Sequence, residues 1–165
     1  MTDRNLILEA INEIDNSVFD RPFLNAKFSV SEDDIKEVER SISISFPLSY
    51  RMFLNFFGSG EFRGMEIRGL VPNKLFQDTS SSALTLNRNL QRDFDFPDDL
   101  FAFENHDGDA VSCLMLSWIE DGECPVILWD HSESYERQLA RPHILAESFG
   151  AYFLHKVREL IAELD

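Results

Sequence analysis

The chain has few cysteines and no long hydrophobic run. Its 165 residues include two cysteines, Cys113 and Cys124, whose separation matches neither a C-x-x-C motif nor a zinc-ligand spacing. Both stand in apolar, strand-like surroundings, which favours buried free thiols over a disulfide and fits a reducing compartment. No window approaches the roughly 18 apolar residues of a membrane span, and the start, MTDRNLILEA, lacks the basic and apolar regions of a secretory signal. We therefore expect no membrane association and a cytoplasmic location.

Positive charge is also scarce. Fifteen Lys and Arg residues stand against thirty Asp and Glu, which gives a formal net charge of −15. This balance argues against direct nucleic-acid binding, because phosphate contacts need clustered Lys and Arg. Part of the acidic excess serves solubility, but such a surface also attracts a basic protein and speeds the encounter with it.

Signatures of catalysis are missing as well. The four histidines form no H-E-x-x-H motif or other zinc spacing. Ser112 or Cys113 could be paired with Asp130 and His131, but no nucleophile motif frames either of them. The glycine pair around Ser59 lacks the lysine of a phosphate-binding loop. We expect no enzyme activity and no cofactor.

The most suggestive polar cluster is Asp107-Gly108-Asp109. Two carboxylates in a tight loop can bind Ca²⁺ or Mg²⁺, which leaves open a metal-dependent enzyme that uses this loop. The fuller D-x-D-x-D-G pattern and its distal Glu are absent, however. The sequence favours a structural turn in which Gly108 adopts a positive φ, and we predict no bound metal.

Apolar periodicity predicts a single α+β domain over residues 1–165. A chain of this length with 15 Phe residues can bury one sizeable core. Asp121-Gly122 lies between two apolar runs and indicates a hairpin. We expect a mainly antiparallel or mixed β-sheet, with N-terminal helices and a C-terminal helix packed on it. The predicted helices span about 4–16, 31–42, 47–57, 81–94 and 147–163, and the predicted strands about 62–71, 100–103, 111–115 and 126–129.

The segment from Val30 to Gly60 contains two helix starts and a helix stop. Ser31 precedes three acidic residues and reads as the start of a capping box. Pro47 suits the first turn of the second helix, since its missing N–H is not needed there, and Gly58 ends that helix. Gly58 and Gly60 could instead allow the close approach of a partner's backbone.

Aromatic residues around this segment are predicted to belong to the core. Tyr50, Phe53 and Phe57 recur at helical spacing, which is more typical of buried packing than of a ligand site. In the preceding loop, we expect Phe19, Phe23 and Phe28 to be pinned to the core.

Four motifs follow one another along the chain. The first motif, in residues 31–60, combines S-E-x-x-I-x-x-x-E, F-P-x-x-Y-x-x-F-L and the glycine pair. The second is ENHDGDAVSC at 104–113, the third is PVILWDH at 125–131, and the fourth is ILAESFGAYFL at 144–154. In this order they resemble the SUKH superfamily, which includes fungal Smi/Knr-type cell-wall regulators and many bacterial immunity proteins. The resemblance implies the α+β fold and structural roles for Glu39, Pro47, Tyr50, Phe53, Leu54, Gly58, Gly60, Trp129, Ser148 and Phe149.

The resemblance also implies a non-enzymatic protein-binding domain. A bacterial member is expected to be an immunity protein that neutralises a toxin, often a nuclease, by stoichiometric binding; the oligomeric state stays open. Acidic residues gather at predicted turns, and we expect them to form one negative field that docks on a basic toxin domain. The candidate contact residues are Asp98, Asp99, Glu104, Asp107, Asp109, Glu120, Asp121 and Glu123. An intracellular scaffold of the cell-wall regulator type, with several weak partners, is the alternative.

Overall fold

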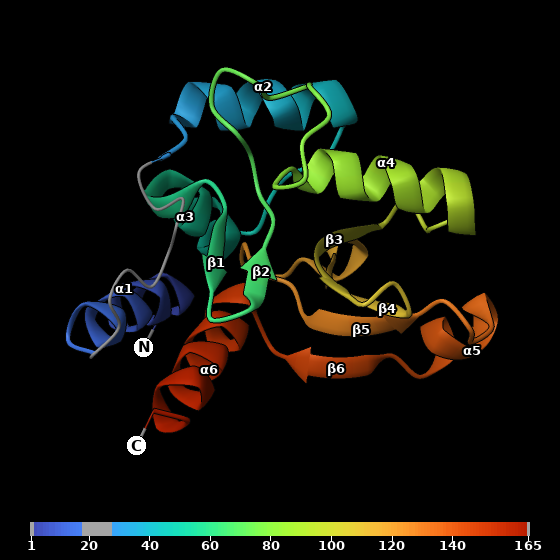
Figure 1. Cartoon of the computed structure of the whole chain (residues 1–165). Coiled ribbons are helices and arrows are strands. Elements are labelled where there is room, and N and C mark those ends of the chain that lie inside the picture. The colour runs from blue at the N-terminus through green and yellow to red at the C-terminus, as the bar shows by residue number, and fades with distance from the viewer. Residues whose placement is uncertain (1, 18–27, 165) are drawn as a thin grey trace.

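The computed structural model describes residues 2–17 and 28–164, and Figure 1 shows its elements. Helices stand at both ends of the chain and the strands lie between them, so the predicted α+β class is confirmed. The elements are α1 (Asp3–Asp15), α2 (Glu32–Ile42), α3 (Leu48–Phe57), β1 (Gly60–Phe62), β2 (Met65–Ile67), α4 (Ala83–Phe94), β3 (Leu100–His106), β4 (Ala110–Met115), the 3₁₀ turn η1 (Leu116–Trp118), β5 (Val126–Asp130), α5 (Tyr135–Ala140), β6 (His143–Ala146) and α6 (Phe149–Ala162).

The main sheet is an antiparallel meander. Its strands lie in the order β3-β4-β5-β6, with Leu100 opposite Met115 in one pair and Leu114 opposite Val126 in the next. The hairpin predicted at Asp121-Gly122 is present, although η1 lengthens the connection between its strands. Each strand therefore runs back along its neighbour, and successive connections lie at opposite ends of the sheet.

The segment 62–71, predicted as a strand interrupted by Gly64 and Gly69, contributes instead to a hairpin over residues 60–67. β1 and β2 pair with each other in a separate two-stranded sheet, and Arg63 and Gly64 turn the chain between them with φ of 46° and 89°. Two consecutive residues at positive φ define the type I′ turn that suits a tight hairpin. The same geometry recurs at Asp107-Gly108 and Asp121-Gly122, so these dipeptides are turn residues, as predicted.

The two helices of the 30–60 segment begin and end close to the predicted positions. The hydroxyl of Ser31 accepts a hydrogen bond from the Asp34 N–H at 3.1 Å and caps α2. Pro47 occupies the N-cap of α3, one residue before the predicted first turn, and Gly58 forms the C-cap with φ of 68°. The close backbone approach at Gly58 comes from the chain itself, because an added Cβ would lie 2.2 Å from the Phe28 carbonyl oxygen.

An ion-pair cluster joins α2 to α3. Arg51 donates hydrogen bonds to Glu39 and to Glu32, and Asn55 donates to Glu32 at 2.8 Å. Glu39 also accepts the backbone N–H of Phe46 at 2.8 Å. The predicted structural role of Glu39 therefore has a physical basis: it holds the loop between the helices and neutralises Arg51.

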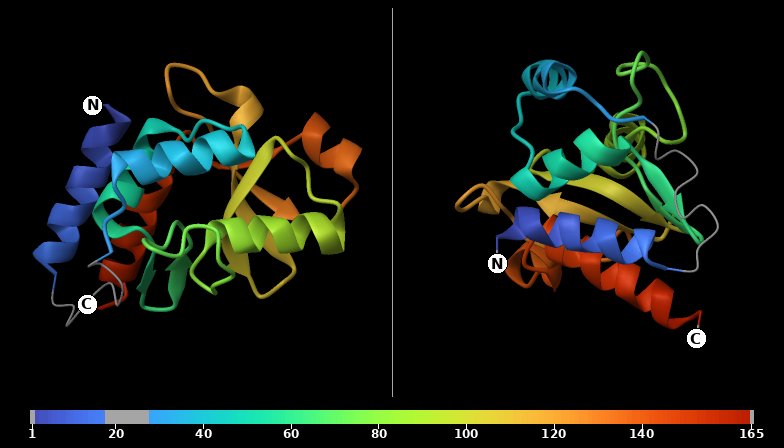
Figure 2. Two further views of the ribbon diagram at one scale, coloured as in Figure 1. Left: turned by 90° about the horizontal axis from the view of Figure 1, so that it is seen from above. Right: turned by 90° about the vertical axis from the view of Figure 1, so that its left-hand side faces the viewer.

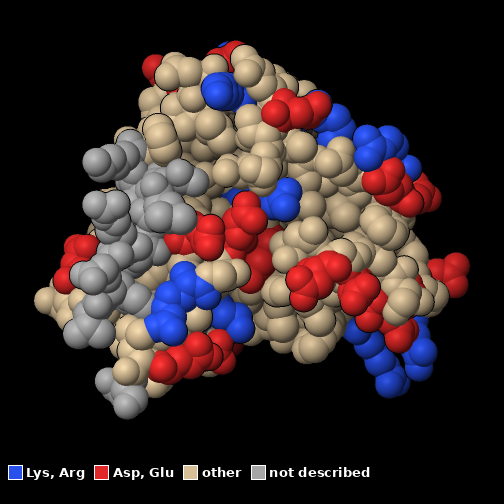
Figure 3. All heavy atoms as spheres, viewed as in Figure 1, with Lys and Arg blue, Asp and Glu red and all other residues tan. Residues whose placement is uncertain are grey.

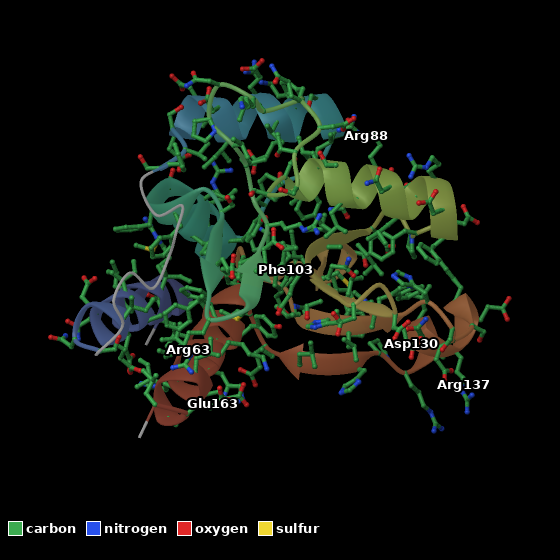
Figure 4. The ribbon with its side chains drawn as sticks, in the orientation of Figure 1. Arg63, Arg88, Phe103, Asp130, Arg137 and Glu163 are labelled. Carbon is green, nitrogen blue, oxygen red and sulfur yellow. The ribbon has the colours of Figure 1, made fainter. Side chains whose placement is uncertain are left out.

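The core is aromatic and centres on Tyr50. Its ring contacts Phe101 and Phe149 edge to face, at centroid distances of 6.1 and 5.0 Å, and its hydroxyl donates to the Arg68 carbonyl at 2.9 Å. Phe53 and Phe103 are fully buried beside it, and Phe103 lies near the centre of the molecule in Figure 4. The aromatic stripe is thus core, as predicted.

The sheet is covered on both faces. Phe101, Phe103, Leu114 and Val126 belong to the cluster shared with α3 and α6, whereas Val111, Cys113, Ile127 and Trp129 belong to a second cluster with Leu86 and Leu90 of α4. Figure 2 shows α4 lying along the sheet, with α1 and α6 packed side by side beyond its edge. Trp129 packs edge to face against Phe96 and Tyr135, which agrees with its predicted anchoring role.

Two expectations about the connecting segments were wrong. Phe28 is not pinned to the core but is 51% exposed; Phe19 and Phe23 lie outside the described residues. The segment between the predicted strand 126–129 and the predicted helix 147–163, for which no helix or strand is predicted, contains α5 and β6, whose six and four residues are too few for a periodic pattern to show. No helix in the described ranges combines the length and apolarity needed to cross a membrane.

Candidate functional site

The candidate contact carboxylates do not form one field. Asp107 and Asp109 flank the β3–β4 turn, whereas Asp98 and Asp99 precede β3 at its other end. The seven residues of β3 separate these groups by about 20 Å at 3.3 Å per residue. The 120–123 turn joins β4 to β5 and lies at the Asp99 end, where the Asp99 carbonyl accepts the Leu116 N–H. The expected single field is therefore wrong.

Surface views support this separation. On the face shown in Figure 3, acidic side chains form separate groups with uncharged and basic side chains between them. Asp130, which pairs with Ala110 beside the Asp107-Gly108 turn, lies at the α5 end of the sheet in Figure 4. The acidic excess is thus divided among several sites.

Glu104 is not a surface contact at all. Its residue is 7% exposed, and its carboxylate accepts a hydrogen bond from the Tyr152 hydroxyl of α6. Burial, together with the neighbouring Glu104 charge, raises the pKa of Tyr152. Glu104 is therefore withdrawn from the candidate contact set. The prediction ended the strand at Phe103 and counted Glu104 with the acidic residues of the following turn, whereas β3 continues to His106 and Glu104 lies at a buried position within it.

Replacing Tyr152 by Phe should leave the buried Glu104 carboxylate without its donor. We expect the free energy of unfolding to fall by about 1–3 kcal/mol, the penalty for an unpaired buried acceptor. Chemical denaturation of Tyr152→Phe and of Tyr152→Phe/Glu104→Leu measures it. The double variant should recover part of the loss; equal stability of wild type and Tyr152→Phe would contradict the assigned bond.

The hollow beside η1 brings together five carboxylates. Three of them belong to the predicted contact set: Glu120, Asp121 and Glu123. The other two are Asp3, at the start of α1, and Glu147, two residues before α6. The hollow measures about 710 Å³. Trp118 and Ile119 also line it and are 46% and 39% exposed. We call this site the η1 hollow.

Glu123 has a structural task within the η1 hollow. Its carboxylate accepts the backbone N–H and the hydroxyl of Ser49, both at 2.7 Å. Pro47, at the N-cap of α3, has no side chain that can accept these bonds, so Glu123 caps the helix from another part of the chain. Burial raises the pKa of Glu123, and the bonds from Ser49 partly oppose that rise.

Removal of this cap should destabilise the fold. We expect Glu123→Ala to lower the free energy of unfolding by about 0.5–2 kcal/mol, as for other helix caps, while Glu123→Gln keeps an acceptor for the Ser49 N–H and loses less. Denaturant unfolding of both variants checks the order. Equal losses would show that no cap bond forms.

The raised pKa of Glu123 also predicts that the stability of the fold depends on pH. The folded protein keeps the Glu123 proton to a higher pH than the unfolded chain, so this residue's contribution is full below its ordinary pKa of 4.5 and falls as pH rises through the folded value. The stability of wild type relative to Glu123→Gln should therefore decrease as the pH rises above the ordinary Glu123 pKa of 4.5. A difference that rises over this range would contradict the assignment.

Polar groups in and around the Asp107–Asp109 loop form hydrogen bonds within the protein. Asn105 accepts the Gly108 N–H through its side chain at 3.2 Å, and the Asp109 carbonyl accepts the His131 N–H at 3.0 Å. Within residues 2–17 and 28–164, no group of three or more His, Cys, Asp or Glu is arranged to hold a metal ion.

The candidate nucleophiles lie inside the protein. Ser112 is fully buried and bonds to His106 Nε2 at 2.7 Å rather than to His131; His131 stacks on Phe94 at 4.2 Å. Burial raises the pKa of Cys113 well above its ordinary value and that of Cys124 to about 12. Both thiols therefore stay protonated at neutral pH and are poor nucleophiles.

Two carboxylates that line the η1 hollow, those of Asp3 and Glu147, were not predicted from the sequence. Asp3 and Glu147 are far apart along the chain, but the Ser148 hydroxyl, at the N-cap of α6, donates to Asp3 at 2.6 Å. Gly150 permits this approach, since an added Cβ would lie 2.6 Å from the Asp3 carbonyl oxygen. Glu147 stands in the ILAESFGAYFL motif, which was the one available signal.

Comparisons with known proteins agree with this architecture. The family model SUKH_5, described as SMI1-KNR4 cell-wall, matches residues 7–158. A crystal structure of a protein from Pseudomonas syringae pv. tomato is similar with a TM-score of 0.56 and 16% identity, over 96% of this chain and 98% of that one. This likeness shows the shared fold, while the family match shows the family. The chain belongs to the SUKH family in its SMI1-KNR4 cell-wall group.

Proposed function

We propose that this chain is a non-enzymatic, cytoplasmic protein-binding domain, an immunity protein that neutralises a basic toxin domain by covering its active site. The observation that carries the proposal is the distribution of polar groups. The hydroxyl and thiols that could serve as nucleophiles are buried, whereas Glu120, Asp121 and Glu147 are exposed. A surface that offers carboxylates suits recognition of a basic partner more than covalent chemistry.

Net charge supports the same partner class. A formal charge of −15 attracts a positively charged domain over distances comparable to the Debye length. Nucleases and other toxins that act on nucleic acid carry basic clefts, and an acidic protein competes there with the phosphate backbone. The proposed mechanism needs no chemical step: binding excludes the substrate.

Co-expression tests the proposal. The chain is produced in cells together with a basic toxin domain from its native host, sought first among the genes that neighbour its own, and cell survival is measured. Survival restored by this chain, and not by a co-expressed unrelated acidic protein, is the expected result. Death of the cells despite soluble expression of both proteins would refute the immunity role.

Salt dependence tests the electrostatic part. The association rate with the toxin domain should fall by about 10-fold or more between low and high ionic strength, since steered encounters are screened by salt. Stopped-flow or surface-based kinetics measures this rate. A rate that is independent of salt would show that the acidic surface does not steer the encounter.

A scaffold role in cell-wall regulation is the second candidate, and the cell-wall description of the matching family model favours it. It predicts several weak partners in place of one tight partner. Quantitative affinity purification from the native host separates the two: one partner at equimolar yield supports immunity, and several at low yield support the scaffold.

A further inference from the structure

The geometry points to the η1 hollow as the docking site for a basic segment of the partner protein, one that presents Lys or Arg beside an apolar side chain. This inference rests on the proposed protein-binding function and assigns it to one surface. Trp118 and Ile119, the carboxylates of Asp3, Glu120, Asp121 and Glu147, and the fixed turn at Glu123 form that surface.

Exposed apolar side chains mark the site. Trp118 is 46% exposed and Ile119 39%, on a connection between β4 and β5 that projects from the body of the fold near the start of α1 in both views of Figure 2. The other tryptophan, Trp129, is 5% exposed. A large aromatic side chain left accessible in a hollow is the type of residue that dominates binding energy at protein interfaces.

The negative charge of the η1 hollow favours a positively charged occupant. No Lys or Arg is among the described residues that line it, whereas five carboxylates are. An acidic peptide or a nucleic acid would meet like charge here, and a Lys or Arg side chain would meet its counter-ion. The hollow between α2 and α4 is less selective, because Arg88 and Asp98 both line it.

The hollow is held in shape by the fold. Glu120 and Glu123 exchange two backbone hydrogen bonds, at 2.8 and 3.1 Å, across the Asp121-Gly122 turn. The Gly122 carbonyl accepts the Leu48 N–H at 2.9 Å, and Glu123 is fixed by Ser49. A site that is ordered before binding loses little conformational freedom on binding, which raises affinity for a given contact area.

Calorimetry with a defined peptide tests the docking site. The probe is a short amidated peptide of alternating Arg, Leu and Gly, with the same peptide carrying Glu in place of Arg as its control. The hollow variants are Trp118→Ala and Glu120→Gln/Asp121→Asn; Asn tolerates the left-handed turn position. The matched control is Glu61→Gln/Glu66→Gln, which makes the same charge change on the β1–β2 pair, on the opposite side of the molecule in Figure 2.

The expected result is binding of the Arg peptide, no binding of the Glu peptide, and affinity at least about tenfold lower in both hollow variants, a change that corresponds to 1.4 kcal/mol. The control should change affinity less than about twofold, as a general charge effect would. In wild type, a blue shift of Trp118 emission should accompany binding. Equal losses in hollow and control variants, or full affinity in Trp118→Ala with its circular dichroism unchanged, would overturn the inference.

Toxin neutralisation separates this inference from the function on which it rests. If wild type protects cells and the hollow variants protect equally well, the docking site is refuted and the immunity function stands. If wild type gives no protection while the Arg peptide binds in the hollow, the immunity function is refuted and the site belongs to another basic partner.

Discussion

The Phe53→Ala variant is expected to lose about 3–5 kcal/mol of unfolding free energy, the usual effect of removing a fully buried phenyl ring. Phe53 is 0% exposed, and its ring contacts Phe57, Phe149 and Phe153 at centroid distances of 5.3–5.4 Å. The ring therefore ties α3 to α6, and the empty volume would be lined by aromatic groups that cannot collapse into it. Urea unfolding followed by circular dichroism measures the loss.

Phe56 is the matched control because it lies on the same helix and is 41% exposed. The same substitution there should change stability by less than about 1 kcal/mol, as for other surface positions. A similar loss in both variants would show that helix propensity, and not the aromatic core, sets the effect.

Gly69→Ala is expected to destabilise the protein by about 3 kcal/mol or more, beyond the usual range for overpacking. An added Cβ at this position would lie 1.8 Å from the Gly58 carbonyl oxygen and 2.8 Å from Leu54 Cδ2. The first contact is to backbone, and the Gly58 carbonyl is fixed there by the Leu70 N–H at 3.0 Å. The chain after β2 would have to move away from the end of α3.

Gly64→Ala separates lack of space from backbone strain. Gly64 has φ of 89° and no atom within 4 Å of a built Cβ, so the substitution should cost only about 1–2 kcal/mol for the left-handed conformation. Thermal unfolding of both variants provides the comparison. A smaller loss in Gly69→Ala than in Gly64→Ala would contradict the close backbone approach.

Local patterns were sufficient to predict most of the elements. The helix starts at Ser31 and Ser148 carry a side chain that accepts the N–H three residues later, and the Asp-Gly dipeptides carry the positive φ of hairpin turns. These signals are contained within four residues. α5 and β6 were missed because they are short. The break at Gly64 was predicted, but the pairing of β1 with β2 was not, because Arg63, which has a positive φ, is not a typical turn residue.

The grouping of carboxylates depended on topology, and there the prediction was wrong. In an antiparallel meander, consecutive connections alternate between the two ends of the sheet, so the Asp107 and Asp121 turns had to lie apart once β4 was recognised as the strand between them. The burial of Glu104 depended on Tyr152, a residue of the last helix. Asp3 and Glu147 joined the η1 hollow through helix packing that no local pattern encodes.

The structural motif and the acidic surface have separate roles in this molecule. Tyr50, Phe53 and Phe149 hold the fold, Glu39 and Ser148 fix helix ends, and the exposed carboxylates beside Trp118 face solvent. A family that keeps the first set while varying the second could change partners without changing fold, since binding specificity is usually determined by surface connections.

Titration of a purified toxin domain tests the central claim, that this chain acts by binding and not by turnover. A toxin domain from which the chain protects cells is held at fixed concentration, well above the dissociation constant, and its residual activity is measured as the chain is added. We expect a linear fall in activity that ends at one equivalent of chain per toxin, with intact toxin recovered after denaturation and separation. Complete inactivation by a small fraction of an equivalent, or chemically altered toxin, would contradict it.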